Sequence, residues 1–208
     1  ERCPQYNPKW EVYSGRGKER KLVRIDYPMA YMAWWYKHRK RCLEGYTVGG
    51  VFITGNFYFY LNFWRIKSKG KGEGWISPRY LDLDKEFFDL IAKAKAENKN
   101  IMFLKRRQIG FSEKVASLVG YDYTFFPGAH CVIVAGEAQY SIGTMGKVTA
   151  GLDALSPSDG NAGREFYKRR VKDVPEMIES GYSAAGVQTG YRTIVEAITV
   201  KDNPAAVN

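Results

Sequence analysis

Cysteine and histidine are scarce in this chain of 208 residues, which contains three cysteines and two histidines. Cys3, Cys42 and Cys131 are odd in number, lie far apart and form no CxxC pair, so they argue against a disulfide framework and against a zinc site. His38 and His130 have no partner at metal-ligand spacing, and we expect both to be surface or capping residues. This use of cysteine favours a reducing, intracellular compartment.

Long hydrophobic segments are also lacking. The longest uncharged stretch, residues 45–64, is 20 residues long and contains four glycines and two asparagines. We interpret it as alternating strands, because a membrane span needs a nearly continuous apolar run. We find no transmembrane helix and no signal peptide, and we expect no membrane partner.

Aromatic and basic side chains are abundant. The chain has 15 Tyr, 11 Phe and 5 Trp, and 45% of its residues are hydrophobic. This is enough for one sizeable core or two small ones, which excludes a disordered chain. The 32 Lys and Arg exceed the 22 Asp and Glu, so the formal net charge is +10. Such a surplus favours a phosphate-bearing partner, although a basic surface also serves solubility alone.

Residues 1–74 form a small basic region that is rich in aromatic residues. The pattern predicts a helix over residues 29–41 and a β-hairpin whose strands, 51–53 and 57–66, are joined by a Gly-Asn turn. Residues 67–74 are rich in Lys and Gly, which indicates a flexible linker. We therefore place a domain boundary after residue 74.

Strands and helices alternate in the second region, residues 75–208. Strands are expected at 101–104, 131–135 and 193–200, and helices at 84–98 with Asp84 as N-cap, 112–123 and 141–155. The first two strands and the helix between them predict a βαβ unit with buried parallel strands. The fold class is therefore α/β, with a parallel sheet flanked by helices.

The connection between the first of these strands and its helix carries the clearest functional signal. It reads Lys105, Arg106, Arg107, Gln108, Ile109, Gly110, Phe111 and Ser112. A phosphate-binding loop occupies this position in nucleotide-binding proteins, where helix amides, a cation and a hydroxyl that holds Mg²⁺ receive the phosphates. The usual pattern GxxxxGK[ST] is not met, because Lys105 replaces its first glycine and Phe111 replaces its lysine. Binding of solvent or of a nucleic-acid backbone is the alternative interpretation.

Residues 78–135, with this octapeptide at their centre, resemble the ATPase domain of the large terminase subunit, the DNA-packaging motor of tailed bacteriophages. In that family an Arg-Gln pair commonly precedes the loop glycine, as Arg107 and Gln108 do here, and some members carry an aromatic residue in place of the lysine. Residues 53–62 are also similar to a stretch that precedes this domain in many terminases. The resemblance covers most of residues 51–202.

This resemblance implies a P-loop NTPase fold of the ASCE, RecA-like type, with ATP and Mg²⁺ as ligands. The implied ATP-binding residues are Lys105, Arg106, Arg107, Gln108, Ile109, Gly110, Phe111 and Ser112. Lys105 would contact the β and γ phosphates, Arg107 would hold or sense the γ phosphate, and Ser112 would ligate Mg²⁺. Arg79 and Tyr80 are candidates for an adenine contact, with a surface arginine and a packed tyrosine as the alternative.

A catalytic acid is lacking, because no apolar run of four residues ends in Asp-Glu. Glu137 and Glu196 follow apolar residues, but Glu137 ends the strand after the loop helix and Glu196 lies within an alternating strand, so we expect neither to be catalytic. The chain begins without Met, and we expect a piece of a longer polypeptide whose acidic (Walker B) strand and nuclease domain follow Asn208. ATP hydrolysis is thus expected of the complete protein.

The resemblance further implies double-stranded DNA, the portal protein of the procapsid and the small terminase subunit as partners. It implies a homo-oligomeric ring in the host cytoplasm that docks transiently on the portal. Two alternatives stay open: a helicase-like P-loop ATPase, and a nucleic-acid-binding module without enzymatic activity. In the second alternative residues 105–107 and 67–71 would line a groove for the backbone.

Overall fold

The computed structural model describes residues 4–67, 74–106, 109–156, 164–184 and 186–201. Five α-helices lie in this part of the chain: α1 Met29–Glu44, α2 Gly55–Asn62, α3 Asp82–Glu97, α4 Phe111–Phe125 and α5 Ala138–Asp153. The strands are β1 Glu11–Ser14, β2 Lys21–Ile25, β3 Tyr46–Val48, β4 Val51–Ile53, β5 Ile66–Lys67, β6 Trp75–Ile76, β7 His130–Ala135, β8 Arg170–Val174, β9 Met177–Ser180, β10 Tyr182–Ala184, β11 Val187–Thr189 and β12 Ile194–Thr199. The chain is therefore mixed α/β as expected, but its four-stranded sheet is mixed and is not the expected parallel sheet.

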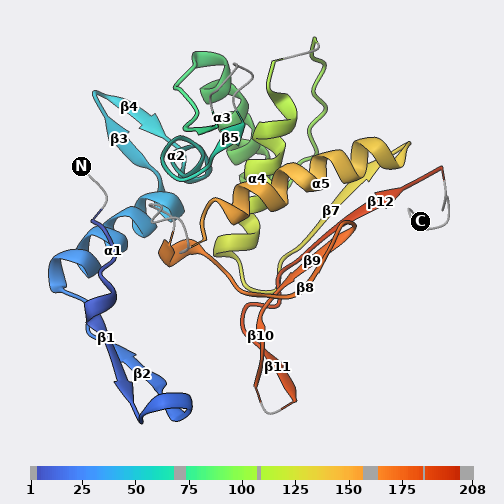
Figure 1. Cartoon of the computed structure of the whole chain (residues 1–208). Helices are drawn as coiled ribbons and strands as arrows, with labels where there is room; N and C mark the ends of the chain where they lie inside the picture. Colours follow the sequence, from blue (N-terminus) through green and yellow to red (C-terminus); the bar gives the residue numbers. More distant parts are fainter. Residues whose placement is uncertain (1–3, 68–73, 107–108, 157–163, 185, 202–208) are drawn as a thin grey trace.

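A mixed sheet of four strands, in the order β7-β12-β9-β8, forms the base of the molecule. β12 runs parallel to β7 and antiparallel to β9, which confirms the two later predicted strands. α5 lies along one face of this sheet (Figure 1). The remaining strands form two-stranded ribbons, β1-β2, β3-β4, β5-β6 and β10-β11.

Three helices follow the hydrophobic periodicity of the sequence. α1 contains the predicted range 29–41, α5 contains residues 141–153 of the predicted range 141–155, and α3 buries Phe87 and Phe88 as expected. α3 ends at Glu97, and Asn98 is its C-cap, with a φ of 51° in the left-handed region that asparagine tolerates. The N-cap prediction for Asp84 is wrong: Asp84 is a buried residue of the first turn, and its carboxylate binds Lys114.

The expected hairpin strand at residues 57–66 is also wrong, because most of this segment belongs to α2. Phe57, Tyr58, Phe59 and Tyr60 are all buried. Four consecutive buried side chains need cover on every side, and a short helix surrounded by other helices provides it. The hairpin at this place is built from β3 and β4 instead, and β5 and β6 pair antiparallel across the expected linker, whose residues 68–73 lie outside the described part.

The first strand of the expected βαβ unit is not formed. Residues 101–104 have no regular structure, and Met102 and Leu104 expose 86% and 96% of their surface. The parallel pair consists of β7 and β12 instead. β7 is not buried on both faces either: Val132 and Val134 are exposed, because α5 covers only the opposite face.

Trp64 fills the space between α4 and α5. Its side chain is fully buried, and its ring lies directly against Gly120 of α4 and Gly151 of α5. A Cβ at either glycine would lie within 2.5 Å of ring carbons. Glycine at these two helix positions therefore permits the close packing around the indole.

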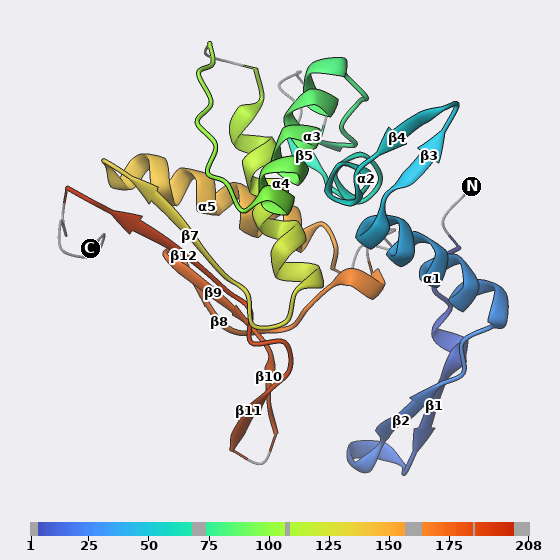
Figure 2. The same cartoon turned by 180° about the vertical axis from the view of Figure 1, so that it is seen from behind.

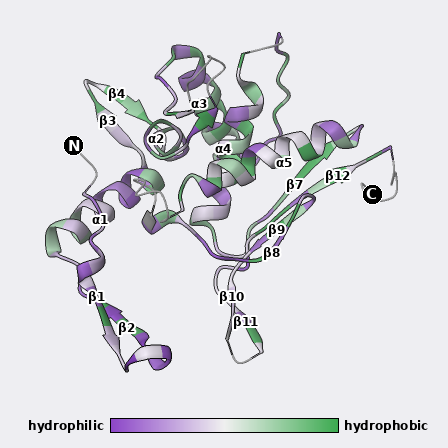
Figure 3. Cartoon of the chain, viewed as in Figure 1, coloured by the Kyte–Doolittle hydropathy of each residue, from purple (hydrophilic) through white to green (hydrophobic). Residues whose placement is uncertain are grey.

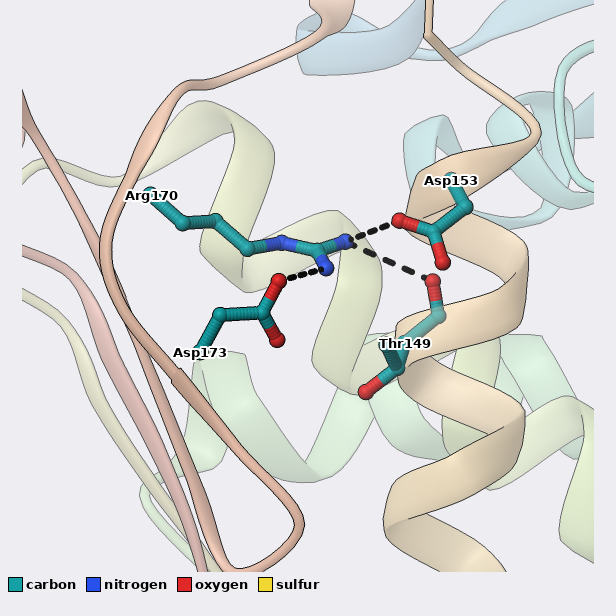
Figure 4. A network of polar contacts seen from close by, with 4 residues as sticks. All are labelled: Thr149, Asp153, Arg170 and Asp173. Atoms are coloured by element: carbon teal, nitrogen blue, oxygen red, sulfur yellow. Dashed lines mark hydrogen bonds and ion pairs between the residues drawn. The ribbon is translucent and has the colours of Figure 1, made fainter.

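Arg170 joins the sheet to α5 (Figure 4). Its Nη2 donates to Asp153 Oδ1 at 2.8 Å and to the Thr149 carbonyl oxygen at 3.4 Å, while its Nη1 donates to Asp173 Oδ2 at 2.9 Å. Only 7% of the Arg170 side chain is exposed. These bonds fix the C-terminal turns of α5 over the start of β8.

No helix in the described part of the chain is long and apolar enough to cross a membrane.

Candidate phosphate-binding site

The candidate loop leads into α4 through Gly110. Gly110 has a φ of 70°, a conformation that favours glycine, and no heavy atom lies within 4 Å of the place that a Cβ would take. Its carbonyl oxygen accepts the first helical bonds, from the amides of Glu113 at 3.1 Å and Lys114 at 3.3 Å. The preceding amides at this end of the helix have no intrahelical acceptor and carry the positive end of the helix dipole. An anion can therefore approach the backbone here.

Exposed polar and basic residues occur at this helix end and just before it in the sequence. Ser112, the second residue of α4, is exposed, and so are Lys105 and Arg106. Lys105 Nζ lies 5.6 Å from the ring centroid of Phe111. The structure thus brings Lys105, Phe111 and Ser112 to one end of one helix. Arg107 and Gln108 lie outside the described residues.

The aromatic residue that replaces the usual lysine has a packing role. The ring of Phe111 lies 5.4 Å from that of Phe87 and 5.6 Å from that of Phe103, in edge-to-face contacts. These contacts fix the first turn of α4 against α3. A cavity of about 190 Å³ lies beside them, and Lys105, Ile109 and Phe111 contribute to its lining.

A buried ion pair, which the sequence interpretation missed, holds α4 to α3. Lys114 binds Asp84, and the two side chains are only 5% and 4% exposed. Lys114 follows Ser112 by two residues, so the pair fixes the orientation of the helix end that would receive phosphate. The signal in the sequence was faint: Lys114, Ser117 and Tyr121 recur at helical spacing on a face that is buried.

The two candidates for an adenine contact lie elsewhere. Tyr80 packs against Phe57, with ring centroids 5.6 Å apart, and lines a second cavity of about 740 Å³ together with Arg41 and Asp82. Arg79 is exposed. Neither residue lines the cavity beside Lys105. The structure therefore does not bring them together with the loop, and the adenine contact stays a prediction.

The two glutamates considered as catalytic acids have local partners. Glu137 is the N-cap residue of α5 and accepts a hydrogen bond from Gln139 Nε2 at 2.8 Å. Glu196 on β12 lies 2.7 Å from His130 Nε2. Within the described residues, no cluster of three or more His, Cys, Asp or Glu side chains can hold a metal ion. The catalytic acid remains unassigned.

The expectation for His38 is wrong, because this side chain is buried on the aromatic face of α1. Its ring stacks on Trp34, with centroids 3.8 Å apart, and its Nδ1 lies 2.7 Å from the hydroxyl oxygen of Tyr58. The spacing Tyr31, Trp35, His38, Cys42 places it on the face that packs against α2. His38 is therefore a structural residue.

Comparison with known proteins gives no match: no family model and no curated protein matches this chain. Function is therefore inferred from the residues at the start of α4. The start of α4, with the exposed hydroxyl of Ser112 and Lys105 beside Phe111, is therefore the candidate phosphate-binding site.

Proposed function

We propose that the chain binds Mg²⁺-ATP at the start of α4 and is the nucleotide-binding part of a viral DNA-packaging motor of the large terminase type. One observation carries this proposal. Gly110 adopts a left-handed conformation at the N-terminus of a helix of 15 residues. Lys105 precedes it in the sequence, and Ser112, with an exposed hydroxyl, follows it.

The residues present fit the chemistry of a nucleoside triphosphate. The α4 amides would receive phosphate oxygens, and Lys105 and Arg106 would neutralise their charge. Ser112 would supply a hydroxyl ligand to Mg²⁺, which neutralises the β and γ phosphates when bound. The role of Arg107 at the γ phosphate is part of the proposal. The P-loop arrangement of the sheet stays a prediction.

The motor function is supported by the resemblance of residues 78–135 and by the net charge of +10. A packaging motor grips the phosphate backbone of DNA without reading its sequence, which requires a surplus of bases. Double-stranded DNA, the portal protein and the small terminase subunit are the proposed partners, with a ring of identical subunits as the working assembly. Hydrolysis would depend on a catalytic acid that is not assigned among the described residues.

The proposal is tested by the substitution Lys105→Ala. Loss of a charge-assisted contact of about 1.5–3 kcal/mol weakens binding about ten- to a hundredfold. Titration with a fluorescent ATP analogue in Mg²⁺ measures the Kd, and thermal unfolding shows that the fold is kept. Lys99→Ala is the matched control, since Lys99 is an exposed lysine whose ammonium lies 2.8 Å from Glu97 Oε2. Equal Kd values for the two variants would refute the assigned role of Lys105.

A nucleic-acid-binding module without ATPase activity is the second candidate. The exposure of Lys105, Arg106 and Lys67 favours it, because exposed bases contact a phosphate backbone as readily as a nucleotide. Salt-sensitive DNA binding is expected of both candidates, whereas Mg²⁺-dependent ATP binding is expected only of the first. The titration with and without Mg²⁺ therefore separates them.

A further inference from the structure

A ribbon of two strands projects from the N-terminal end of the molecule. β1 and β2 pair antiparallel, from Glu11 opposite Ile25 to Ser14 opposite Lys21. Figures 1 and 2 show from opposite sides that the ribbon extends beyond α1, away from the four-stranded sheet. All residues from Tyr13 to Arg24 are exposed, so both faces of the ribbon are open to solvent over most of its length.

The far end of this ribbon carries a concentration of positive charge. Residues 16–21 hold four bases, Arg16, Lys18, Arg20 and Lys21, and one acid, Glu19. Within the described part of the chain no acidic side chain forms an ion pair with these four bases. Arg24, nearer the base of the ribbon, is paired with Asp26 at 2.8 Å. Figure 3 shows this end of the ribbon in the colours of hydrophilic residues.

Aromatic packing fixes the ribbon to α1. Trp10 and Tyr27, which flank the two strands, both pack on Tyr31, with ring centroids 5.0 and 5.2 Å away. Tyr31 is buried, and its hydroxyl donates to Glu165 Oε1 at 2.9 Å. A basic hairpin held in this way loses little conformational freedom when a partner binds. Because of this anchoring the ribbon has a fixed orientation relative to α1, which an unanchored basic tail would lack.

We propose that the β1-β2 ribbon is a contact surface for double-stranded DNA. A two-stranded ribbon fits the major groove of B-DNA, and the phosphates that line the groove would face the bases on either edge. The charge at its tip matches a polyanion, which makes a duplex a better partner than the neutral or basic surface of a protein. Arg20 also stacks on Tyr13, 4.1 Å from the ring centroid, which holds one guanidinium in place. The choice of DNA as the partner rests on the proposed function. The ribbon itself is independent of the nucleotide site, because it is separate from the loop at α4.

The test removes the four charges at the tip with Arg16→Gln, Lys18→Gln, Arg20→Gln and Lys21→Gln in one variant. The matched control removes four charges elsewhere with Lys93→Gln, Lys99→Gln, Lys172→Gln and Lys201→Gln, all exposed residues outside the ribbon. Fluorescence anisotropy with a labelled duplex of mixed sequence measures the affinity between about 50 and 200 mM salt. The two variants have the same net charge, so a difference between them reports the ribbon itself.

The ribbon variant is expected to lose at least about tenfold in affinity relative to the control. The slope of log K against log salt is expected to fall by about 0.9 for each phosphate contact that is lost. Equal affinities of the two variants would overturn the proposal. Failure of the unsubstituted chain to bind the duplex, or a preference for single strands, would also overturn it. So would the finding that the chain is a dimer and that only the ribbon substitutions dissociate it.

Failure of this proposal and failure of the proposed function give different results. If the ribbon binds DNA, the ribbon variant keeps the ATP affinity of the unsubstituted chain, and the Lys105→Ala variant keeps the DNA affinity of the unsubstituted chain. DNA binding that depends on the ribbon, in a chain that binds no ATP, would support the ribbon and refute the nucleotide site. ATP binding with equal DNA affinities of ribbon and control variants would do the reverse.

Discussion

Replacing Gly151 with alanine tests the packing of Trp64 between α4 and α5. A Cβ at Gly151 would lie 2.1 Å from Cζ2 of the indole, far inside the contact distance of two carbon atoms. Trp64 cannot move away, because its side chain is fully buried and Gly120 contacts its other edge. Gly146 on the same helix is the control, since no heavy atom lies within 4 Å of the place for its Cβ.

The expected magnitudes follow from two opposing effects. Alanine stabilises a helix interior by about 1 kcal/mol relative to glycine, and Gly146→Ala should show this gain alone. Overpacking costs up to about 3 kcal/mol, so Gly151→Ala should lose about 2 kcal/mol net. In a chain of this size, 1 kcal/mol shifts Tm by about 2–4 °C. We therefore expect Tm to fall by about 4–8 °C for Gly151→Ala and to rise by about 2–4 °C for Gly146→Ala.

Thermal unfolding followed by circular dichroism measures both shifts. Combining Gly151→Ala with Trp64→Phe should restore part of the loss, because the smaller ring leaves room for the methyl group. A rise in Tm for Gly151→Ala as large as that for Gly146→Ala would refute the placement of Trp64 between the two helices.

Three further substitutions or titrations address the ion pairs and a thiol. Asp84→Asn should lower the free energy of unfolding by about 3–5 kcal/mol, because it leaves the Lys114 ammonium buried without its counter-charge; urea unfolding measures this, and a loss below about 1 kcal/mol would contradict burial of the pair. Arg170→Met removes the hydrogen bonds to Asp153 and Asp173 and should lower the free energy of unfolding by about 1–3 kcal/mol. The loss is no larger because both carboxylates stay solvated; an unchanged midpoint in calorimetry would refute the network. Burial raises the pKa of Cys131 from 9.0 to about 11, so the stability that its protonated thiol contributes is present below pH 9 and is lost as the pH rises through about 11. Rapid alkylation of Cys131 at pH 8, followed by mass spectrometry, would contradict this shift.

Elements with clear helical periodicity were predictable from the sequence. In α3 the spacing of Phe87, Phe88 and Ile91 defines one apolar face, and Asn98 marks the end of the helix. β7 and β12 were predictable as short apolar runs, but their parallel pairing was not, because the sequence interpretation paired residues 131–135 with residues 101–104. The helices and these two strands depend on local sequence, which is why they could be predicted without the rest of the fold.

The continuous aromatic run at residues 57–60 was not predictable in the same way. Phe and Tyr favour strands, but a run that is buried on every side has no periodicity that separates a strand from a helix. The apolar residues 101–104 presented the same difficulty. Their composition favours a strand, but no neighbouring strand pairs with them in the described part of the chain. In both segments the tertiary surroundings decide the structure.

Part of the candidate site was predictable from local sequence, and part depends on tertiary contacts. The positions of Gly110 and Ser112 at the start of α4 follow from local sequence and are as expected. The ion pair between Asp84 and Lys114 joins residues 30 positions apart, and the packing of Phe111 on Phe87 joins two helices. Such contacts depend on how α3 and α4 cross, which local patterns do not encode.

Isothermal titration of the unsubstituted chain with ATP, in Mg²⁺ and again in EDTA, tests the central claim most directly. We predict saturable binding of one ATP per chain in Mg²⁺, much weaker binding in EDTA, and competition by ADP but not by adenosine, because the α4 amides, Lys105 and Ser112 would hold phosphates and their metal. Absence of saturable binding, or competition by adenosine as strong as that by ADP, would contradict a phosphate-binding site at the start of α4.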